Sequence, residues 1–225
     1  IGAALGYKIV IVMPDTMSEE RRRIVKAYGA ELILTEGKLG MAGAVAKSEE
    51  LAKAHDYFLI RQFENAANLL SHEETTAVEI LHDLSGEVDA FVAGVGTGGT
   101  ISGVGKVLKA HHSNVLDAAV QPAKSPVLTG GTPAGHGIQG IGANFIPGIY
   151  DKDVVDEVLD MDEETAYAAA RELGKKAGLL VGMSSGGNFA AAKVIAKNLG
   201  KGKKVVTVLP DTGERYLSTI LFAEE

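Results

Sequence analysis

A glycine-rich turn is the clearest chemical feature of the sequence. Between an apolar run and a helical pattern it combines glycines with two threonines: Gly94, Gly96, Thr97, Gly98, Gly99 and Thr100. Glycines let a backbone turn tightly, so consecutive N–H groups can point into one concavity at a helix N-terminus, and such a concavity binds phosphate. The threonine hydroxyl groups can add donors. The turn therefore predicts a phosphate site, with a plain strand-to-helix turn as the alternative.

Two nucleotide motifs fit the same turn incompletely. Its glycines match the dinucleotide pattern G-x-G-x-x-G, which expects an acidic residue about 20 residues later to hold a ribose. The next apolar run ends in Gln121 and supplies no acid. The nearest approach to a P-loop has Thr100 in place of its first glycine and no hydroxyl residue after Lys106. Neither nucleotide motif is complete.

A second glycine–serine motif, at 182–186, matches G-x-S-x-G. As a nucleophile elbow it would make Ser184 attack an ester, and that arrangement needs a histidine later in the chain than the serine. The last histidine is His136, so the triad cannot be completed in the expected order. A hydrolase is therefore disfavoured. The alternative is that Ser184 or Ser185 caps a helix over 187–199.

Charge and composition exclude several classes of function. The chain has 22 Lys and Arg against 29 Asp and Glu, a net charge of −7, which does not favour binding to nucleic acid or an anionic membrane. With no cysteine it can form neither a disulfide nor a thiolate metal site. The histidines lack metal-ligand spacing, so we expect no metal. The longest apolar runs are too short to span a bilayer, and we expect a cytoplasmic protein.

Strands and helices alternate along the chain and must position these groups. The predicted strands are 8–13, 31–34, 57–60, 88–93, 114–120, 154–158, 179–183 and 204–209. The predicted helices are 40–54, 100–112, 162–177 and 187–199, with two more opened by capping boxes at Thr16/Glu19 and Ser71/Glu74. Apolar strands that alternate with helices predict an α/β fold whose mostly parallel sheet is covered on both faces.

Two stretches break this rhythm. The segment 122–147 has no regular periodicity and is too apolar for disorder, so we expect it to fold over a site. The interruption at 65–70 is the best candidate for a join between two lobes, and we predict a smaller lobe over 1–66 and a larger, phosphate-binding lobe over 67–225. The chain opens without methionine on what reads as the end of a helix. We therefore expect its beginning to be missing.

Taken together, the motifs resemble the cysteine synthase (O-acetylserine sulfhydrylase) family, in the tryptophan synthase β class of pyridoxal-phosphate (PLP) enzymes. The likeness extends over the whole chain in the family's order, and rests on the stretches 7–22, 26–31, 62–65, 96–100, 138–147, 182–186 and 210–218. The resemblance implies a two-lobed α/β fold with mostly parallel, twisted sheets and helices on both faces, here N-terminally incomplete. It places the cofactor between the lobes.

The resemblance also implies roles for individual residues. Gly96–Thr100 looks like the loop that holds the PLP phosphate, and Ser184 looks like the hydroxyl that bonds the pyridine nitrogen. A serine partner does not favour a protonated ring, which suits β-elimination and β-replacement. Gln62 looks like a contact for the substrate carboxylate. Gly140 lies in the stretch Gly137–Gly142, which resembles the mobile loop that lines the site.

The implied reaction converts O-acetyl-L-serine and sulfide to L-cysteine and acetate. The family's Schiff-base lysine is expected upstream of Ile1, so no catalytic residue is assigned in this chain, which by itself should be inactive. Lys38, Lys106 and Lys124 are interpreted as surface residues. Similar enzymes are homodimers, and many bind the C-terminal tail of serine acetyltransferase. The alternatives are a cystathionine β-synthase-like enzyme, a non-catalytic regulatory homologue and, less favoured, a threonine dehydratase-like deaminase.

Overall fold

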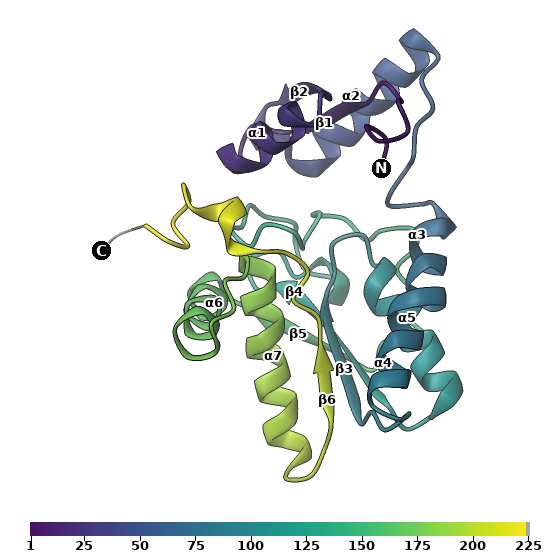
Figure 1. Cartoon of the computed structure of the whole chain (residues 1–225), viewed down its shortest axis with the longest axis vertical. Helices are drawn as coiled ribbons and strands as arrows, with labels where there is room; N and C mark the ends of the chain where they lie inside the picture. Colours follow the sequence, from purple (N-terminus) through teal and green to yellow (C-terminus); the bar gives the residue numbers. More distant parts are fainter. Residues whose placement is uncertain (224–225) are drawn as a thin grey trace. The chain divides into compact units, whose positions relative to one another are not determined.

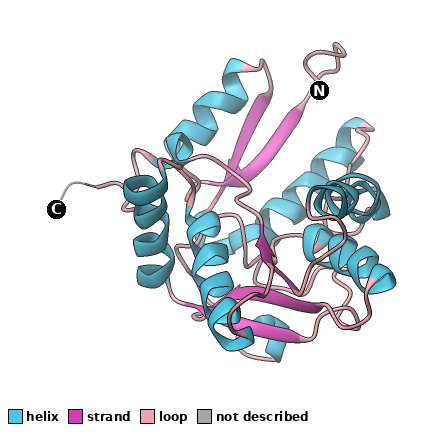
Figure 2. Cartoon of the chain, turned by 60° about the horizontal axis from the view of Figure 1, so that its bottom comes forward, coloured by secondary structure: helices cyan, strands magenta, loops and turns pink. Residues whose placement is uncertain are grey.

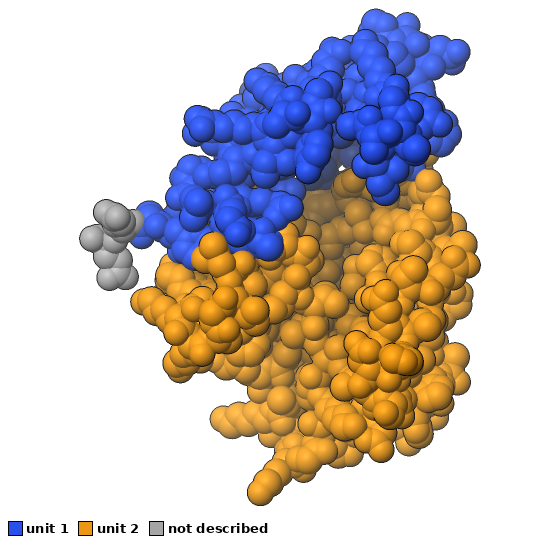
Figure 3. Space-filling model, viewed as in Figure 1, with its two compact units in different colours: residues 1–60, 212–225 blue, residues 61–211 orange. Residues whose placement is uncertain are grey.

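The computed structural model describes residues 1–223 and divides the chain into two compact units (Figure 3). One unit contains Ile1–Ile60 and the C-terminal residues from Thr212 on, and the other contains Arg61–Asp211. The predicted join lay a few residues later and kept the C-terminal residues in the larger lobe. They belong with the first unit because both the backbone N–H and the hydroxyl of Ser218 donate to the carboxylate of Glu20, at 2.7 and 2.8 Å. The assignment of lobes stays a prediction.

The first unit is a two-stranded parallel sheet with helices. Its elements are β1 (Val10–Pro14), α1 (Glu19–Ala27), β2 (Glu31–Thr35), α2 (Gly40–His55) and the 3-10 turns η1 (Gly37–Leu39) and η4 (Gly213–Tyr216). The predicted capping box of Thr16 and Glu19 is wrong. Ser18 is the N-cap, and its hydroxyl accepts from the Arg21 N–H at 3.4 Å. A neighbouring serine in the right backbone conformation outcompetes the threonine for this role.

The second unit is a four-stranded parallel sheet between two layers of helices (Figure 1). Its strands are β3 (Ala90–Gly94), β4 (Leu116–Pro122), β5 (Glu157–Met161) and β6 (Val205–Thr207), in the order β5-β4-β3-β6. Its helices are α3 (Ala66–Ser71), the π-helical turn η2 (His72–Thr76), α4 (Ala77–Asp83), α5 (Gly99–His111), α6 (Glu163–Ala177) and α7 (Met183–Leu199). Figure 1 shows α6 and α7 on one face of the sheet and α3, α4 and α5 on the other.

The sheet and α5 share a continuous apolar core. β3 is buried from Ala90 to Ala93, as expected for a central parallel strand covered on both faces. The buried side chains that pack together on the α5 side include Phe91, Val95, Ile101, Val104, Leu108 and Val115. This core fixes the start of α5 directly above the end of β3, where the glycine turn connects them. None of the helices in residues 1–223 is long and apolar enough to cross a membrane.

The alternation of strands and helices is confirmed, with nearly all boundaries within three residues of those predicted (Figure 2). Two predicted strands are wrong. The segment 57–60 is irregular and pairs with no strand among the described residues. Only Val181 of 179–183 forms a bridge, because α6 ends at the left-handed Gly178 and α7 already begins at Met183. The five residues between these helices, 178–182, leave no room for a strand.

The second predicted capping box is also wrong. Ser71 is the last residue of α3, and the chain continues as a helix through η2 into α4. The N-cap of this run is Asn65, whose side chain accepts from the Ala67 N–H at 3.0 Å. The Ser71 hydroxyl instead donates to the Asn68 carbonyl at 2.7 Å. The sequence pattern S-x-x-E therefore lies inside a helix rather than at its start.

Candidate active site

The glycine turn lies at the point where the strand order of the sheet reverses. The chain passes from β3 to β4 and β5 on one side, then returns to place β6 on the other side of β3. In parallel α/β sheets, ligands bind beyond the carboxyl ends of the strands at such a switch point. The turn that follows Gly94 is therefore in the position where this architecture builds a site.

Asn188 of α7 bridges β3 and the residues after β6 at the switch point. Its Oδ1 accepts from the Gly94 N–H at 2.8 Å, and its Nδ2 donates to the Val208 carbonyl at 2.9 Å. The side chain is buried, with 2% of its surface exposed. It thus satisfies two backbone groups where the ladder between the strands has ended. The sequence did not predict these contacts, because nothing local indicates a partner 94 residues away.

The turn presents backbone N–H groups at the start of α5. Gly98 is the N-cap, with φ +89°, and has no side chain to cap the helix, while the Gly99 N–H donates to Thr97 Oγ1 at 3.4 Å. Its conformation suits glycine, because φ is in the left-handed region. Uncapped N–H groups at a helix N-terminus carry partial positive charge and bind anions. The predicted phosphate loop therefore offers backbone donors of the required kind.

Asn68 fixes one side of the turn. Its Nδ2 donates both to Thr97 Oγ1 at 3.0 Å and to the backbone carbonyl of Gln62 at 2.9 Å. A Cβ on Gly99 would clash with Asn68 Oδ1, so a glycine lets the two segments approach. Gln62, the predicted substrate contact, is thereby held beside the turn, and its residue is exposed. Asn68 was not predicted as part of the site, although it lies in the segment that was recognised as interrupting the helical pattern.

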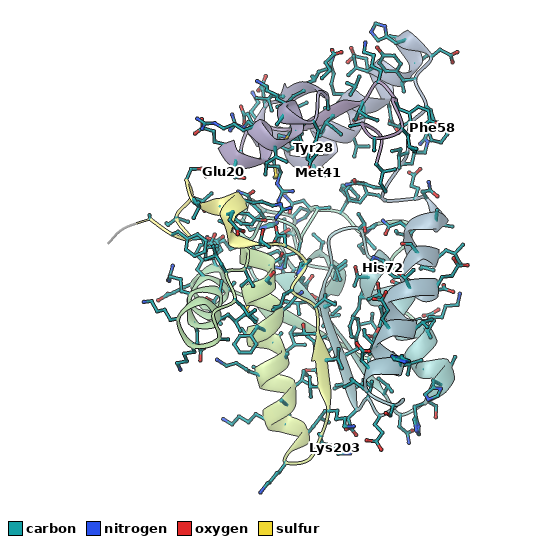
Figure 4. The ribbon with its side chains drawn as sticks, in the orientation of Figure 1. Glu20, Tyr28, Met41, Phe58, His72 and Lys203 are labelled. Atoms are coloured by element: carbon teal, nitrogen blue, oxygen red, sulfur yellow. The ribbon has the colours of Figure 1, made fainter. Side chains whose placement is uncertain are left out.

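His72 lies one helical turn after Asn68 and contacts the start of α5 from the same helical run (Figure 4). Its Nε2 lies 3.2 Å from Thr100 Oγ1, and its Nδ1 lies 3.0 Å from Thr76 Oγ1. Burial lowers the pKa of His72, so the ring is neutral at pH 7. A neutral ring with one donor and one acceptor nitrogen matches two hydroxyl partners. His72 lies in the π-helical turn, a distortion often found at functional sites.

Gly140 connects the turn with Ser184. A Cβ on Gly96 would clash with the carbonyl oxygen of Gly140, and a Cβ on Gly140 would lie 3.0 Å from Ser184 Oγ. The structure therefore brings both predicted cofactor contacts, the glycine turn and Ser184, against the same residue of the long loop. After Pro122, the last residue of β4, the segment 122–147 contains only the 3-10 turn η3 (Val127–Thr129), and through Gly140 it does reach the predicted site.

The hydroxyl of Ser184 is free for a ligand. The residue is 3% exposed and lies in the first turn of α7, one residue after the helix begins. The interpretation of Ser184 or Ser185 as an N-cap is wrong, because the N-cap is Gly182 and no side chain bonds the helix start. Among residues 1–223 no hydrogen bond engages the Ser184 hydroxyl, whereas that of Ser185 donates to the Asp211 carbonyl at 3.4 Å. The oxygen is not among the fully enclosed unpaired polar atoms of the described residues, so a ligand can reach it.

The three lysines that were interpreted as surface residues are all exposed. The exposed fractions of their side chains are 77% for Lys38, 57% for Lys106 and 63% for Lys124. Each lies within salt-bridge distance of a glutamate. None is therefore buried or desolvated in the way that activates an amine for covalent chemistry.

The arrangement fits a phosphorylated heteroaromatic ligand. The uncapped amides of the turn suit a dianionic phosphate, and the unpaired hydroxyl of Ser184 suits a ring nitrogen. Gly140 lies against both, so the two contacts belong to one place in the molecule. Pyridoxal phosphate carries both of these groups on one ring.

Comparison with known proteins decides the family. The family model described as "Pyridoxal-phosphate dependent enzyme" matches residues 1–211. The chain belongs to this family. A cysteine synthase of Staphylococcus aureus strain N315 is 53% identical over 222 residues, which cover 98% of this chain and 72% of that protein.

Solved structures of the same family share the fold. A cysteine synthase (OASS) of Entamoeba histolytica matches with a TM-score of 0.91 and 46% identity, over all of this chain and 68% of that one. An O-ureido-L-serine synthase matches with a TM-score of 0.94 and 44% identity, over 98% of this chain and 70% of that one. The expected PLP fold, with parallel sheets and helices on both faces, is confirmed.

Proposed function

We propose that the protein is a PLP-dependent cysteine synthase, which replaces the acetate of O-acetyl-L-serine with sulfide. In this reaction the Cβ–O bond breaks, acetate leaves with the bonding electrons, and a C–S bond forms to give L-cysteine. The observation that carries the proposal is the contact of Gly140 with both Gly96 and Ser184, in a chain that is 53% identical to a cysteine synthase. Bound PLP would supply an electron sink that lets the β-substituent of an amino acid leave.

The residues of this chain would bind and orient the cofactor. The backbone amides of Gly96–Thr100 would hold its phosphate, aided by the hydroxyls of Thr97 and Thr100. If the His72 ring donates from Nε2 to Thr100, that hydroxyl keeps its own proton for the phosphate. Ser184 would donate to the ring nitrogen without protonating it, which keeps the ring a mild electron sink.

The substrate would meet residues on two segments. The exposed side chain of Gln62 would donate to the substrate carboxylate, from a backbone that Asn68 ties to the turn. Gly140 would leave space for the substrate beside the ring, because it has no side chain. We also propose that none of the lysines of this chain bonds covalently to the cofactor, consistent with the exposure of Lys38, Lys106 and Lys124.

The assembly and location of the protein are part of the same proposal. We propose a homodimer in the cytoplasm whose active-site cleft accepts the C-terminal tail of serine acetyltransferase. Light scattering during gel filtration tests the dimer. A synthetic peptide with that tail's sequence should compete with O-acetyl-L-serine, and a peptide that binds without competing would contradict the cleft as its site.

The activity is tested with the full-length protein and two substrate pairs. O-acetyl-L-serine with sulfide should give L-cysteine at least about tenfold faster than L-serine with homocysteine gives cystathionine, a difference of about 1.4 kcal/mol in the barrier. The reverse preference would favour the cystathionine β-synthase-like alternative. Cofactor binding without turnover of either pair would favour a regulatory homologue. Borohydride reduction followed by peptide mapping locates the lysine that holds the cofactor.

A further inference from the structure

Both polar groups of the Gly137 backbone are held by one helix. The N–H of Gly137 donates to Glu163 Oε1 at 2.8 Å, and its carbonyl accepts from the Tyr167 hydroxyl at 2.8 Å. Glu163 and Tyr167 both belong to α6, four residues apart, and so lie on one face of that helix. Gly137 begins the stretch Gly137–Gly142 that carries Gly140. The loop over the site is therefore attached to α6 by side chains.

The hydroxyl of Tyr167 lies where a side chain of residue 137 would begin. A Cβ on Gly137 would clash with the Tyr167 hydroxyl and would lie 3.2 Å from the Glu163 carboxyl group. The φ angle of Gly137 is not in the left-handed region, so the backbone itself would accept alanine. A side chain at position 137 is therefore excluded by steric hindrance rather than by backbone strain. The atoms that would clash with it are those of Tyr167 and Glu163, which also bond the Gly137 backbone.

The two side chains are themselves well fixed. Tyr167 is 7% exposed, and burial, with a smaller contribution from Glu163, raises its pKa to about 12, so it stays a donor at neutral pH. Lys124 lies 2.9 Å from Glu163. Although burial favours the protonated form of Glu163, the contacts with Lys124 and the Gly137 N–H lower its pKa. Glu163 is therefore a charged acceptor at neutral pH.

The helix that holds the loop is packed closely on the helix that carries Ser184. A Cβ on Gly186 of α7 would clash with the carbonyl of Ala166 in α6, so the two backbones approach closely there. The far end of the loop is attached to the turn instead, since the Gly142 N–H donates to the Val95 carbonyl at 2.9 Å. Gly140 lies between these two attachments.

We propose that Tyr167 and Glu163 clasp the peptide of Gly137 and thereby set the position of Gly140 and the opening of the loop for substrate. They are positioning residues, because they act through the Gly137 backbone and do not touch the predicted cofactor contacts. This inference rests on the proposed function for its kinetic consequence only. The attachment of the loop can be measured without cofactor or substrate.

The first test is hydrogen exchange of the peptide that spans 134–142, measured on the full-length protein without added substrate. Tyr167→Phe removes the hydroxyl and should speed exchange in this peptide about fivefold, the effect of one neutral hydrogen bond. Glu163→Ala should do the same, and Glu163→Gln should restore most of the protection because its amide oxygen can still accept. Tyr28→Phe is the matched control, since Tyr28 is 72% exposed. Exchange unchanged in both Tyr167→Phe and Glu163→Ala would overturn the clasp.

The second test is the coupling between Gly137 and Tyr167. Gly137→Ala should speed exchange by displacing the hydroxyl, and the Gly137→Ala/Tyr167→Phe double variant should be no worse than either single variant. Additive effects would contradict a direct clasp.

In turnover with O-acetyl-L-serine, Tyr167→Phe should raise KM about fivefold with a smaller change in kcat. If the Tyr167→Phe enzyme is active with an unchanged KM, the contacts with Gly137 have only a structural role, and their proposed role in substrate binding is overturned. Absence of activity in the unmodified enzyme would overturn the proposed function and leave the exchange result valid.

Discussion

Ser184 Oγ lies 3.0 Å from the position that a Cβ would take on Gly140. This short approach leaves the hydroxyl facing a residue with no side chain, and no other described residue bonds it. Gly140 also lies close to the glycine turn, because a Cβ on Gly96 would clash with the Gly140 carbonyl oxygen. The two ends of the predicted cofactor site are therefore linked through a single residue of the loop.

Replacement of Gly96 by alanine should disrupt this linkage. The added methyl group would push the Gly140 backbone away, because backbone cannot give way as a flexible side chain does. Affinity for pyridoxine 5′-phosphate, measured by calorimetry, should fall at least about tenfold. Gly135→Ala is the matched control, since nothing lies within 4 Å of its Cβ position. Equal losses in both variants would argue against a specific role for Gly96.

Replacement of Ser184 by alanine should reduce turnover without unfolding the protein. The variant loses a partner for the ring nitrogen, so kcat/KM with O-acetyl-L-serine should fall by roughly 10- to 100-fold. Because the hydroxyl bonds no described residue, the thermal midpoint without cofactor should stay within about 1 °C of the unmodified protein. A large drop in the midpoint together with normal kinetics would show that Ser184 is structural.

Replacement of Asn188 by alanine should destabilise the second unit. It leaves the half-buried Gly94 N–H and Val208 carbonyl without their partner, and the expected loss in free energy of unfolding is about 2 kcal/mol. Urea titration followed by circular dichroism measures this loss. Asn198→Ala on the exposed face of the same helix should cost less than about 0.5 kcal/mol. Similar values for the two variants would contradict the bridging role.

Asp117 of β4 should make stability fall with rising pH. The residue is fully buried with both carboxylate oxygens unpaired, and burial raises its pKa to about 8 against the opposing charge of Lys109. Between pH 4 and 8 the unfolded chain releases this proton while the folded chain keeps it, so folding loses free energy as pH increases. A shift of this size corresponds to a loss on the order of 5 kcal/mol.

Asp117→Asn tests this dependence because it removes the titration and keeps the shape. Urea unfolding at pH 5 and pH 8 should show a smaller decrease in stability for the variant than for the unmodified protein. Asp156→Asn is not a suitable control, since Asp156 accepts from the Asp117 N–H at 2.8 Å and pairs with Lys109. Asp153→Asn is suitable, because Asp153 is exposed. If the free energy of unfolding depends on pH in the same way in Asp117→Asn and in the unmodified protein, Asp117 is not protonated in the folded state and the prediction is wrong.

The parts of the site that depend on local sequence could be predicted. The turn at 96–100 needs only glycines between a strand and a helix, and its position at the end of β3 follows from that order. The family resemblance added Ser184 and Gln62. The structure places Gln62 beside the turn and Ser184 against Gly140.

The parts that depend on distant contacts could not be predicted. Asn68 and His72 lie 29 and 28 residues from the threonines they contact, and Asn188 lies 94 residues from Gly94. An isolated asparagine or histidine in a helical pattern carries no sign of such a partner. The incorrect strand at 179–183 has a local origin, because a short apolar run resembles a strand although Leu179 and Leu180 lie exposed in the connection between α6 and α7.

A crystal structure of the full-length protein with pyridoxal phosphate tests the central claim most directly. The account predicts the phosphate within hydrogen-bond distance of the backbone N–H groups of Gly96–Thr100, and the ring nitrogen within about 3 Å of Ser184 Oγ. A phosphate bound elsewhere, or a ring nitrogen that faces solvent while Ser184 stays unpaired, would contradict it.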